Sequence, residues 1–324
     1  MDLVIGLDVG GTLVKGAVVD REGNSVQNFV FETRIRKGAE NFVRRLSSKL
    51  QGIVAVMEKG GNRIVGIGMG VAGKILQREG KIVFSPNLMP LNDYSLVPVL
   101  KENLGLPVFM DNDANTFGIG ERWKGAGMEY RNWLGITLGT GVGGVLILDG
   151  KRWQGDDIGF VAEIGHTIIY PDGPLCNCGK RGCLEALASA PALIKGVKEA
   201  IEKENRHTEL ITAYEKDELD ALAIARAAEN GDDLANWLFQ RFGKALGIAI
   251  SNSFNLLGIA TCIIGGGVSA AWPLFIGETM KTIRDVNSMV DFDRVVITRA
   301  TLGNKAAALG AARLAWIELE KNFA

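Results

Sequence analysis

The sequence predicts an α/β protein built from two related domains. Short buried runs rich in Val, Ile and Leu alternate with segments whose apolar residues recur at helical spacing. A strand, a glycine turn and a second strand occur near residues 8–16 and again near 138–146, which forms a weak internal repeat. The length of 324 residues agrees with two domains of roughly 150 residues each.

The first half of the chain is expected to begin with a strand over 3–8, a glycine turn and a return strand over 13–20. Residues 39–58 predict a helix, because their apolar positions are three or four residues apart. The other elements predicted here are strands over 63–73, 81–85 and 107–113 and a helix over 96–104.

The second half opens with a predicted strand over 133–138, a glycine turn over 139–144 and a return strand over 145–150. Residues 155–185 are irregular and rich in Cys and Gly. The spacing then predicts helices over 191–204, 217–229, 232–258 and 304–321 and strands over 259–264 and 294–300. Ser269 is expected to cap the helix that follows the glycines 265–267.

Composition excludes several classes of protein. The 36 Lys+Arg and 37 Asp+Glu residues leave a net charge of −1, so a dedicated nucleic-acid binder is not expected. Four cysteines in 324 residues do not make a disulfide scaffold. The N-terminus lacks the features of a signal peptide, and polar residues and glycines interrupt the uncharged run between Lys244 and Glu278. We therefore expect a cytoplasmic protein without a membrane span.

Two glycine hairpins suggest phosphate binding. GTGVGG at 139–144 matches the dinucleotide pattern, but a strand follows it where that pattern requires a helix. No P-loop motif occurs. DVGGT at 8–12 is the same type of turn, and two such turns facing one cleft would present N–H groups and Thr hydroxyls to a triphosphate. A plain hairpin remains the alternative for each turn. Asp8 would assist a hydrated Mg²⁺ or merely stabilise its turn.

DNDAN at 111–115 places polar groups at the carboxyl end of a predicted strand, where open α/β sheets bind ligands. An EF-hand is excluded, because the sixth position is Thr116 and the twelfth is Arg122. Asp113 is a candidate for accepting a proton from a substrate hydroxyl. The alternative is that this segment only caps the helix beginning near Ala114.

His166, Cys176, Cys178 and Cys183 are the clearest metal-binding candidates. One imidazole and three thiolates form a known type of structural zinc site, although the C-x-C spacing is tighter than usual. Small buried thiols beside a core histidine are the alternative. Cys262 lies in an apolar run and is expected to be inert core.

Glu163 and Glu185 flank this cysteine block. Taken alone, these glutamates would be ordinary surface carboxylates. The chain's other histidine, His207 in NRHTE, is expected to lie on the solvated surface. A loop clamped by zinc would hold both glutamates rigidly, as a binding site requires.

The sequence resembles the ROK family from end to end. The resemblance is carried by LDVGGT with Lys15-Gly16 (7–16), DNDAN (111–115), LGTGVGG (138–144), EIGH (163–166), CNCGKRGCLE (176–185) and IIGGGVS (263–269). The cysteine–glutamate block is highly specific to this family, whereas the other motifs are shared more widely among actin-like sugar kinases and Hsp70-type ATPases.

The resemblance implies an actin-like ATPase (ribonuclease H-like) fold with two α/β domains around a central cleft and a last helix that returns to the first domain. The expected domains are 1–112 plus 303–324, and 113–302. The implied activity is ATP- and Mg²⁺-dependent phosphorylation of a hexose hydroxyl, usually at C6, with Asp113 as catalytic base. The substrate-binding residues implied by motif match are Gly73, Asn87, Asn112, Asp113, Glu163, His166 and Glu185. The expected ATP-binding residues are Asp8, Gly10, Gly11, Thr12, Lys15, Gly139, Thr140, Gly141, Gly265, Gly266 and Gly267.

Glucose is the expected substrate. N-acetylglucosamine, N-acetylmannosamine, fructose and allose remain alternatives, because many members carry a Trp shortly after the Asn of PNL and this chain has MPLNDYSL (89–96) there. Polyphosphate or ADP would be alternative phosphoryl donors. A sugar-responsive repressor is the distant alternative, since LDVGGT begins at residue 7 and leaves no room for a DNA-binding segment. Family likeness also suggests a homodimer.

Overall fold

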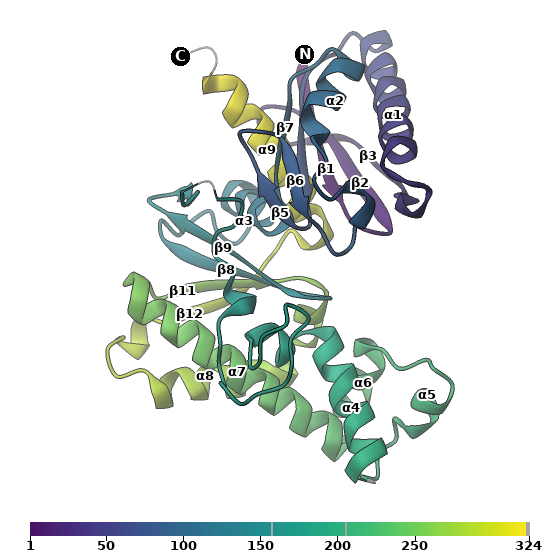
Figure 1. The fold of residues 1–324 in the computed structure, drawn as a ribbon. Coiled ribbons are helices and arrows are strands. Elements are labelled where there is room, and N and C mark those ends of the chain that lie inside the picture. The colour runs from purple at the N-terminus through teal and green to yellow at the C-terminus, as the bar shows by residue number, and fades with distance from the viewer. Residues whose placement is uncertain (157, 205, 322–324) are drawn as a thin grey trace. The chain divides into compact units, whose positions relative to one another are not determined.

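The structure, a computed structural model, describes residues 1–156, 158–204 and 206–321. The chain divides into two compact units. Unit 1 contains Met1–Arg131, Val145–Val161 and Ala300–Ala324, and unit 2 contains Asn132–Gly144 and Ala162–Arg299. Both units combine a sheet with helices, as the sequence predicts (Figure 1).

The sheet of unit 1 has five strands in the order β3-β2-β1-β4-β7. Strands β1, β2 and β3 pair antiparallel, whereas β4 and β7 run parallel to β1. The bounds are β1 Asp2–Val9, β2 Leu13–Val19, β3 Ser25–Glu32, β4 Arg63–Val71 and β7 Val108–Asn112. The predicted first hairpin is thus confirmed as β1 and β2.

Helices cover both faces of this sheet because successive residues of a buried strand point to opposite sides. Leu3, Ile5 and Leu7 of β1 join a core with α1 (Ala39–Lys59) and α2 (Leu96–Leu104). The intervening Val4 packs instead with residues of the C-terminal helix α9 (Ala306–Lys321). Figure 1 shows α1 and α2 on one side of the strands and α9 on the other.

Glycines let α9 lie unusually close to its neighbours. A Cβ added at Gly68 of β4 would lie 1.8 Å from the carbonyl oxygen of Ala311. A Cβ at Gly310 would lie 1.7 Å from the carbonyl oxygen of Thr116, which belongs to α3 (Asp113–Lys124). No other residue type fits at such distances, so these positions account for part of the glycine excess.

Glu121 links the C-terminal end of α3 to the residues just before α9 through hydrogen bonds. Its side chain is fully buried, and its carboxylate accepts backbone N–H groups from Ala126 at 2.8 Å and Leu302 at 2.9 Å. Helix α3 therefore packs within unit 1. The chain crosses to unit 2 between residues 131 and 132, whereas the crossing expected from the sequence lies between 112 and 113.

The second sheet has the order β10-β9-β8-β11-β12. Strands β8, β11 and β12 are parallel, and β9 carries the chain from unit 2 into unit 1 after Gly144. The strands are β8 Trp133–Leu138, β9 Val142–Leu148, β10 Lys151–Arg152, β11 Thr261–Gly265 and β12 Val296–Arg299. The glycine turn between β8 and β9 confirms the second predicted hairpin and excludes the dinucleotide-binding interpretation.

Unit 2 also contains several helices. They are α4 Ala190–Glu204, α5 Ile211–Glu215, α6 Ala221–Glu229, α7 Asp233–Leu257 and α8 Trp272–Val286. Helices α7 and α8 touch at Gly243, whose carbonyl oxygen accepts a hydrogen bond from the Thr279 hydroxyl at 3.1 Å. A Cβ at Gly243 would lie 2.5 Å from the carbonyl oxygen of Phe275.

Some elements differ from the sequence prediction. Strands β3, β10 and β5 (Lys74–Leu76) and helix α5 were not predicted, although β6 (Lys81–Phe84), the partner of β5, was. The prediction that Ser269 caps the next helix is wrong. Ser269 lies inside a 3₁₀ turn, its hydroxyl donates to the carbonyl oxygen of Gly266 at 2.7 Å, and α8 begins after Ala271. The short 3₁₀ helices are Ile35–Lys37, Met89–Leu91, Ile164–His166, Leu184–Ala186, Gly267–Ala271, Phe292–Arg294 and Gly303–Lys305.

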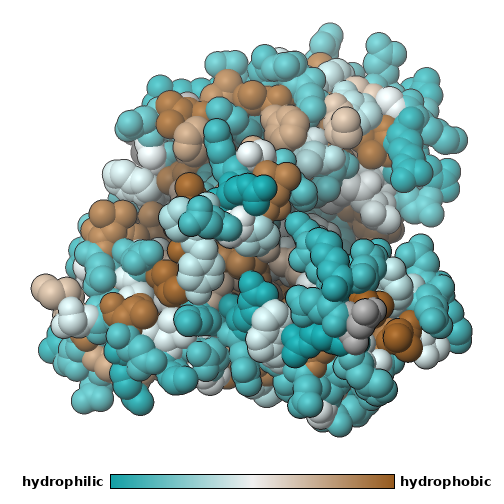
Figure 2. Space-filling model, turned by 60° about the horizontal axis from the view of Figure 1, so that its bottom comes forward, coloured by the Kyte–Doolittle hydropathy of each residue, from teal (hydrophilic) through white to brown (hydrophobic). Residues whose placement is uncertain are grey.

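Hydrophilic side chains prevail on the face of the molecule shown in Figure 2, and hydrophobic residues form small separate groups among them. Within the described residues, no helix combines the length and the hydropathy needed to cross a bilayer.

Replacing Gly310 by Ala should lower the free energy of unfolding by about 2 kcal/mol or more, because the new methyl group would collide with backbone atoms of α3. Gly52→Ala is the matched control. Gly52 lies on the exposed side of α1 with open space around it, so this substitution should stabilise the protein by about 0.5–1 kcal/mol. Denaturant unfolding of the two variants measures both effects, and equal stability would contradict the close packing of α9.

Candidate active site

In unit 1 the polar turns lie at one edge of the sheet. The register pairs Asp8 of β1 with Gly70 of β4, and Gly70 with Asp111 of β7. These three strands are parallel, so the turns that follow them leave the sheet on the same side. At about 4.8 Å per strand, the ends of β1 and β7 are roughly 10 Å apart. The sequence could predict this edge but not its register.

Two hydrogen bonds, one within the backbone and one from Thr33, fix the shape of the first hairpin turn. The Gly10 N–H donates to the carbonyl oxygen of Leu13 at 3.0 Å, and the Thr33 hydroxyl donates to that of Gly10. Thr12 is exposed and Gly11 half-buried. Burial raises the pKa of Asp8, and the ammonium of Lys15, its partner across the hairpin, opposes this rise.

The segment around Asn87 lies directly on this hairpin. A Cβ at Gly11 would lie 2.8 Å from the carbonyl oxygen of Asn87, whose side chain is exposed. The segment around Asn87 is stabilised by Asn92, whose side-chain oxygen accepts the Ser85 N–H at 2.7 Å. Asn92 belongs to the stretch in which the sequence departs from the ROK pattern.

Asn112 and Asp113 form the turn between β7 and α3. The side-chain oxygen of Asn112 accepts the Ala114 N–H at 2.8 Å and so caps α3. Its amide group donates to the carbonyl oxygen of Gly73 at 2.9 Å. Gly73 has a φ of +135° and faces the carbonyl oxygen of Phe84, and both features require glycine. Asp113 is the first residue of α3, and its side chain is half-buried.

In unit 2 the second hairpin and the triple glycine meet in the same way. Gly265 of β11 pairs with Thr137 of β8. A Cβ at Gly266, whose φ is +84°, would lie 2.3 Å from the carbonyl oxygen of Leu138. Gly139, exposed Thr140 and Gly141 follow immediately. The turns after β8 and β11 therefore lie side by side at one edge of the sheet. Glycines line both turns, and Gly265, Gly266 and Gly267 belong to the second.

The predicted site residues Glu163 and Glu185 of unit 2 lie beside the start of β9. Glu185 accepts the Val142 N–H at 3.0 Å, and a Cβ at Gly141 would lie 2.5 Å from its carboxylate. Gly165, in the turn that carries Glu163 and His166, would place a Cβ 2.1 Å from the carbonyl oxygen of Val142. Both predicted glutamates are thus anchored beside the second hairpin.

Surrounding protein atoms partly desolvate Glu163 and raise its pKa. The nearby His166 acts in the opposite direction, and the carboxylate of Glu185 adds to the rise. His166 and Glu185 therefore lie close enough to Glu163 to influence its charge. A carboxylate whose desolvation is only partly compensated is suited to accept hydrogen bonds from a polar ligand.

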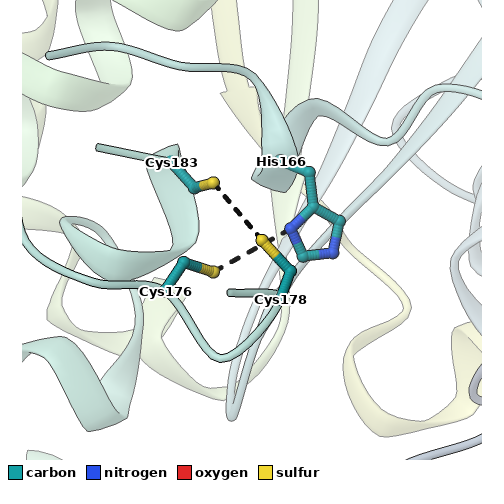
Figure 3. A group of neighbouring side chains, drawn as sticks. All are labelled: His166, Cys176, Cys178 and Cys183. Atoms are coloured by element: carbon teal, nitrogen blue, oxygen red, sulfur yellow. Dashed lines mark hydrogen bonds between the residues drawn. The ribbon is translucent and has the colours of Figure 1, made fainter. Parts of the chain in front are cut away.

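His166, Cys176, Cys178 and Cys183 converge on one point (Figure 3). Their ligand atoms all lie within 4.8 Å of one another. The sulfurs of Cys178 and Cys183 are 3.6 Å apart, and the Cys176 sulfur is 4.0 Å from Nδ1 of His166. Ligands about 2.3 Å from a tetrahedral zinc ion lie about 3.8 Å apart. The cluster therefore has the chemistry and the spacing of a metal site.

Tight turns create this cluster locally. The Cys176 N–H donates to the Lys180 carbonyl oxygen at 2.8 Å, and the Gly179 N–H donates back to that of Cys176 at 2.9 Å. Gly182 has a φ of +72°, and an added Cβ there would overlap the carbonyl oxygen of Tyr170. Loss of water around the thiol raises the pKa of Cys176 to about 12, while backbone hydrogen bonding lowers the pKa of Cys178. Cys262 is fully buried in β11, apart from these residues in the sequence.

Sequence reasoning missed one feature of the site. Arg152 of β10 forms a buried ion pair with Asp111, its Nε lying 3.0 Å from Oδ2. The DNDAN motif pointed to Asp111, but no spacing rule connects it with Arg152. Only the folded sheet brings the two residues together.

Two α/β units, each with a glycine hairpin at the edge of its sheet, define a protein of the actin-like ATPase fold. The chain belongs to the ROK family, which matches residues 4–317.

Individual relatives differ in what they do. A glucokinase of Thermotoga maritima is 33% identical over 311 residues, covering 96% of this chain and 96% of the relative. The structure of a ROK glucokinase from Streptomyces griseus, in complex with glucose and AMPPNP, superposes with a TM-score of 0.80 at 32% identity, covering 97% of this chain and 99% of that one. A xylose repressor of Caldicellulosiruptor bescii is 28% identical over 307 residues, covering 95% of this chain and 76% of the repressor.

Proposed function

We propose that the protein is a sugar kinase that transfers a phosphoryl group from ATP to a hydroxyl of a hexose, with glucose as substrate and glucose 6-phosphate as product. The observation that carries this proposal is the register of β1, β4 and β7. It sets a hairpin suited to phosphates and a carboxylate suited to a hydroxyl proton at the same sheet edge. The glucokinase relatives support the reaction.

Phosphoryl transfer depends mainly on positioning and on neutralising charge. The N–H groups of Gly11 and Thr12 would hold phosphate oxygens, while Gly10 shapes the turn through its bond to Leu13 and the ammonium of Lys15 lies close by. In unit 2, the glycine edges at 139–141 and 265–267 are suited to contacts with the nucleotide. When bound, Mg²⁺ neutralises phosphate charge, and Asp8 would hold one of its water ligands.

Asp113 would act as the general base. Its backbone starts α3, and the bonds of Asn112 to Ala114 and Gly73 fix the turn that carries it. The carboxylate would accept the proton of the sugar hydroxyl as the hydroxyl oxygen bonds to the γ-phosphorus of ATP and the bond from that phosphorus to the oxygen of the leaving ADP breaks. Asn87, Asn112 and Gly73 lie beside it in unit 1 and are the proposed sugar contacts there.

Glu163, His166 and Glu185 are proposed to bind the remaining sugar hydroxyls. The carboxylates accept charge-assisted hydrogen bonds. His166 directs Nδ1 toward the thiols, which leaves Nε2 for the sugar. One histidine would thus connect the metal cluster with the substrate.

We further propose that the cluster of His166, Cys176, Cys178 and Cys183 holds one structural Zn²⁺. Thiolate and imidazole are ligands that zinc favours. With all four positions taken by protein, the ion would have no open coordination site and would act by stiffening the loop that carries Glu185. A cytoplasmic location and a homodimer complete the proposal.

A coupled ADP-release assay tests the reaction and the substrate. With Mg-ATP and glucose, mannose, fructose, allose, N-acetylglucosamine and N-acetylmannosamine in parallel, we expect the highest kcat/KM for glucose. Preference for an N-acetylated sugar would keep the mechanism and change the substrate. No turnover with any sugar, with polyphosphate and ADP also tried as donors, would contradict the kinase proposal and favour a sugar-binding regulator.

Asp113→Asn should lower kcat at least about 100-fold, because the amide cannot take the hydroxyl proton. Its melting temperature should match that of the unaltered protein. Asp285→Asn, an exposed change on α8, is the matched control and should leave kcat unchanged. A nearly normal rate in the Asp113 variant would remove Asp113 from the role of base.

The purified protein should contain about one zinc ion per chain by elemental analysis. After chelation, the exposed Cys178 should react first with a thiol reagent under native conditions, whereas Cys262, with no exposed surface, should react only on unfolding. Restoring zinc should protect Cys178, and Cys178→Ser should lose the fast phase. Equal reactivity with and without zinc would argue against the site.

A further inference from the structure

Arg152 and Asp111 form an ion pair in the interior of unit 1. Their side chains are only 7% and 2% exposed, and Nε of Arg152 lies 3.0 Å from Oδ2 of Asp111. Nη2 of the same guanidinium donates to the side-chain oxygen of Gln77 at 3.1 Å. Burying two charges costs much of what their attraction returns, so such a pair is weak as a stabilising device. Its geometry therefore calls for a second explanation.

The other carboxylate oxygen of Asp111 reaches the turn that precedes α3. Oδ1 accepts the backbone N–H of Asn112 at 2.7 Å and the side-chain amide of Asn115 at 2.8 Å. Asn112 in turn caps α3 and bonds to Gly73. Continuous polar contacts thus lead from Gln77 through Arg152 and Asp111 to both sides of Asp113.

Two hydrogen bonds hold Oδ1 of Asp111, whereas Oδ2 faces the guanidinium of Arg152. Burial raises the pKa of Asp111, and the guanidinium of Arg152 counteracts that rise. The guanidinium contacts Oδ2 through Nε and is held at the same time by Gln77 through Nη2, so it restricts the position of the carboxylate. Lysine carries the same charge but has a single nitrogen in place of the two that contact Asp111 and Gln77.

We propose that Arg152 is a positioning residue for catalysis: by orienting the Asp111 carboxylate it fixes the Asn112–Asp113 turn and aims the side chain of Asp113. Arg152 itself does not touch the substrate. The inference rests on the proposed role of Asp113 as base. It adds to the reaction a residue of β10, which lies far from the DNDAN motif in the sequence.

The first test is hydrogen–deuterium exchange of Arg152→Lys, which needs no activity. The amides of 112–115 should exchange about tenfold faster than in the unaltered protein, while those of α1 keep their rates. Arg63→Lys is the matched control, because Arg63 also pairs with an aspartate, Asp2, but does so on the surface. Unchanged exchange at 112–115 would overturn the proposal.

The second test separates positioning from stability by steady-state kinetics. Arg152→Lys should lower kcat about tenfold and leave the KM for Mg-ATP within twofold, because small misplacements of a reacting group are costly. Arg152→Met leaves Asp111 buried without its partner and is expected to be unstable, so Asp111→Asn/Arg152→Met removes both charges. This double variant should unfold near the normal temperature and still turn over at least tenfold more slowly.

The outcomes distinguish this inference from the proposed function. A double variant with normal kcat, or a loosened turn in Arg152→Lys with unchanged kcat, would show a purely structural pair. If the unaltered protein phosphorylates no sugar, the proposed function fails, and the exchange experiment still decides whether Arg152 fixes the turn.

Discussion

The parallel pairing of β1, β4 and β7 is the constraint on which the site of unit 1 depends. Parallel strands in register deliver their carboxyl ends to a common edge, so residues separated by a hundred positions become neighbours. Unit 2 repeats the principle with β8 and β11. Each edge needs turns whose backbone comes close to other atoms, and glycine supplies them at Gly11, Gly73 and Gly266.

The two units hold their carboxylates by different means. In unit 1, Asp111 and Asn112 are fixed by hydrogen bonds that the sheet register makes possible. In unit 2, Glu185 is tied to a backbone N–H of β9 and lies two residues after a cysteine of the metal cluster. A bound metal would therefore influence Glu185 and His166 directly, whereas the cation beside Asp111 is the guanidinium of Arg152.

Local patterns were predictable from the sequence and distant contacts were not. The hairpins, the helix over 96–104 and the cysteine cluster each depend on residues close in the chain, so spacing alone identified them. The edge strand β3 was not predicted because its Val and Phe residues are interrupted by Gln27 and Asn28, and all its residues are exposed or half-buried. The role of Arg152 could not be predicted because its partner, Asp111, lies in another strand. The close fit of α9 against α3 also depends on contacts between residues far apart in the sequence. Because of this fit α3 belongs to unit 1, and the chain crosses to unit 2 only after α3.

The return of α9 to the first unit has a consequence for biosynthesis. Val4, Ala17 and Val19 lie near the amino terminus, yet their apolar face is covered by residues 309–319. A ribosome makes the chain from the amino end at about 5–20 residues per second. This face of the first sheet must therefore remain uncovered until residues 309–319 have been synthesised. A truncation that removes α9 would leave this apolar face of the sheet exposed permanently.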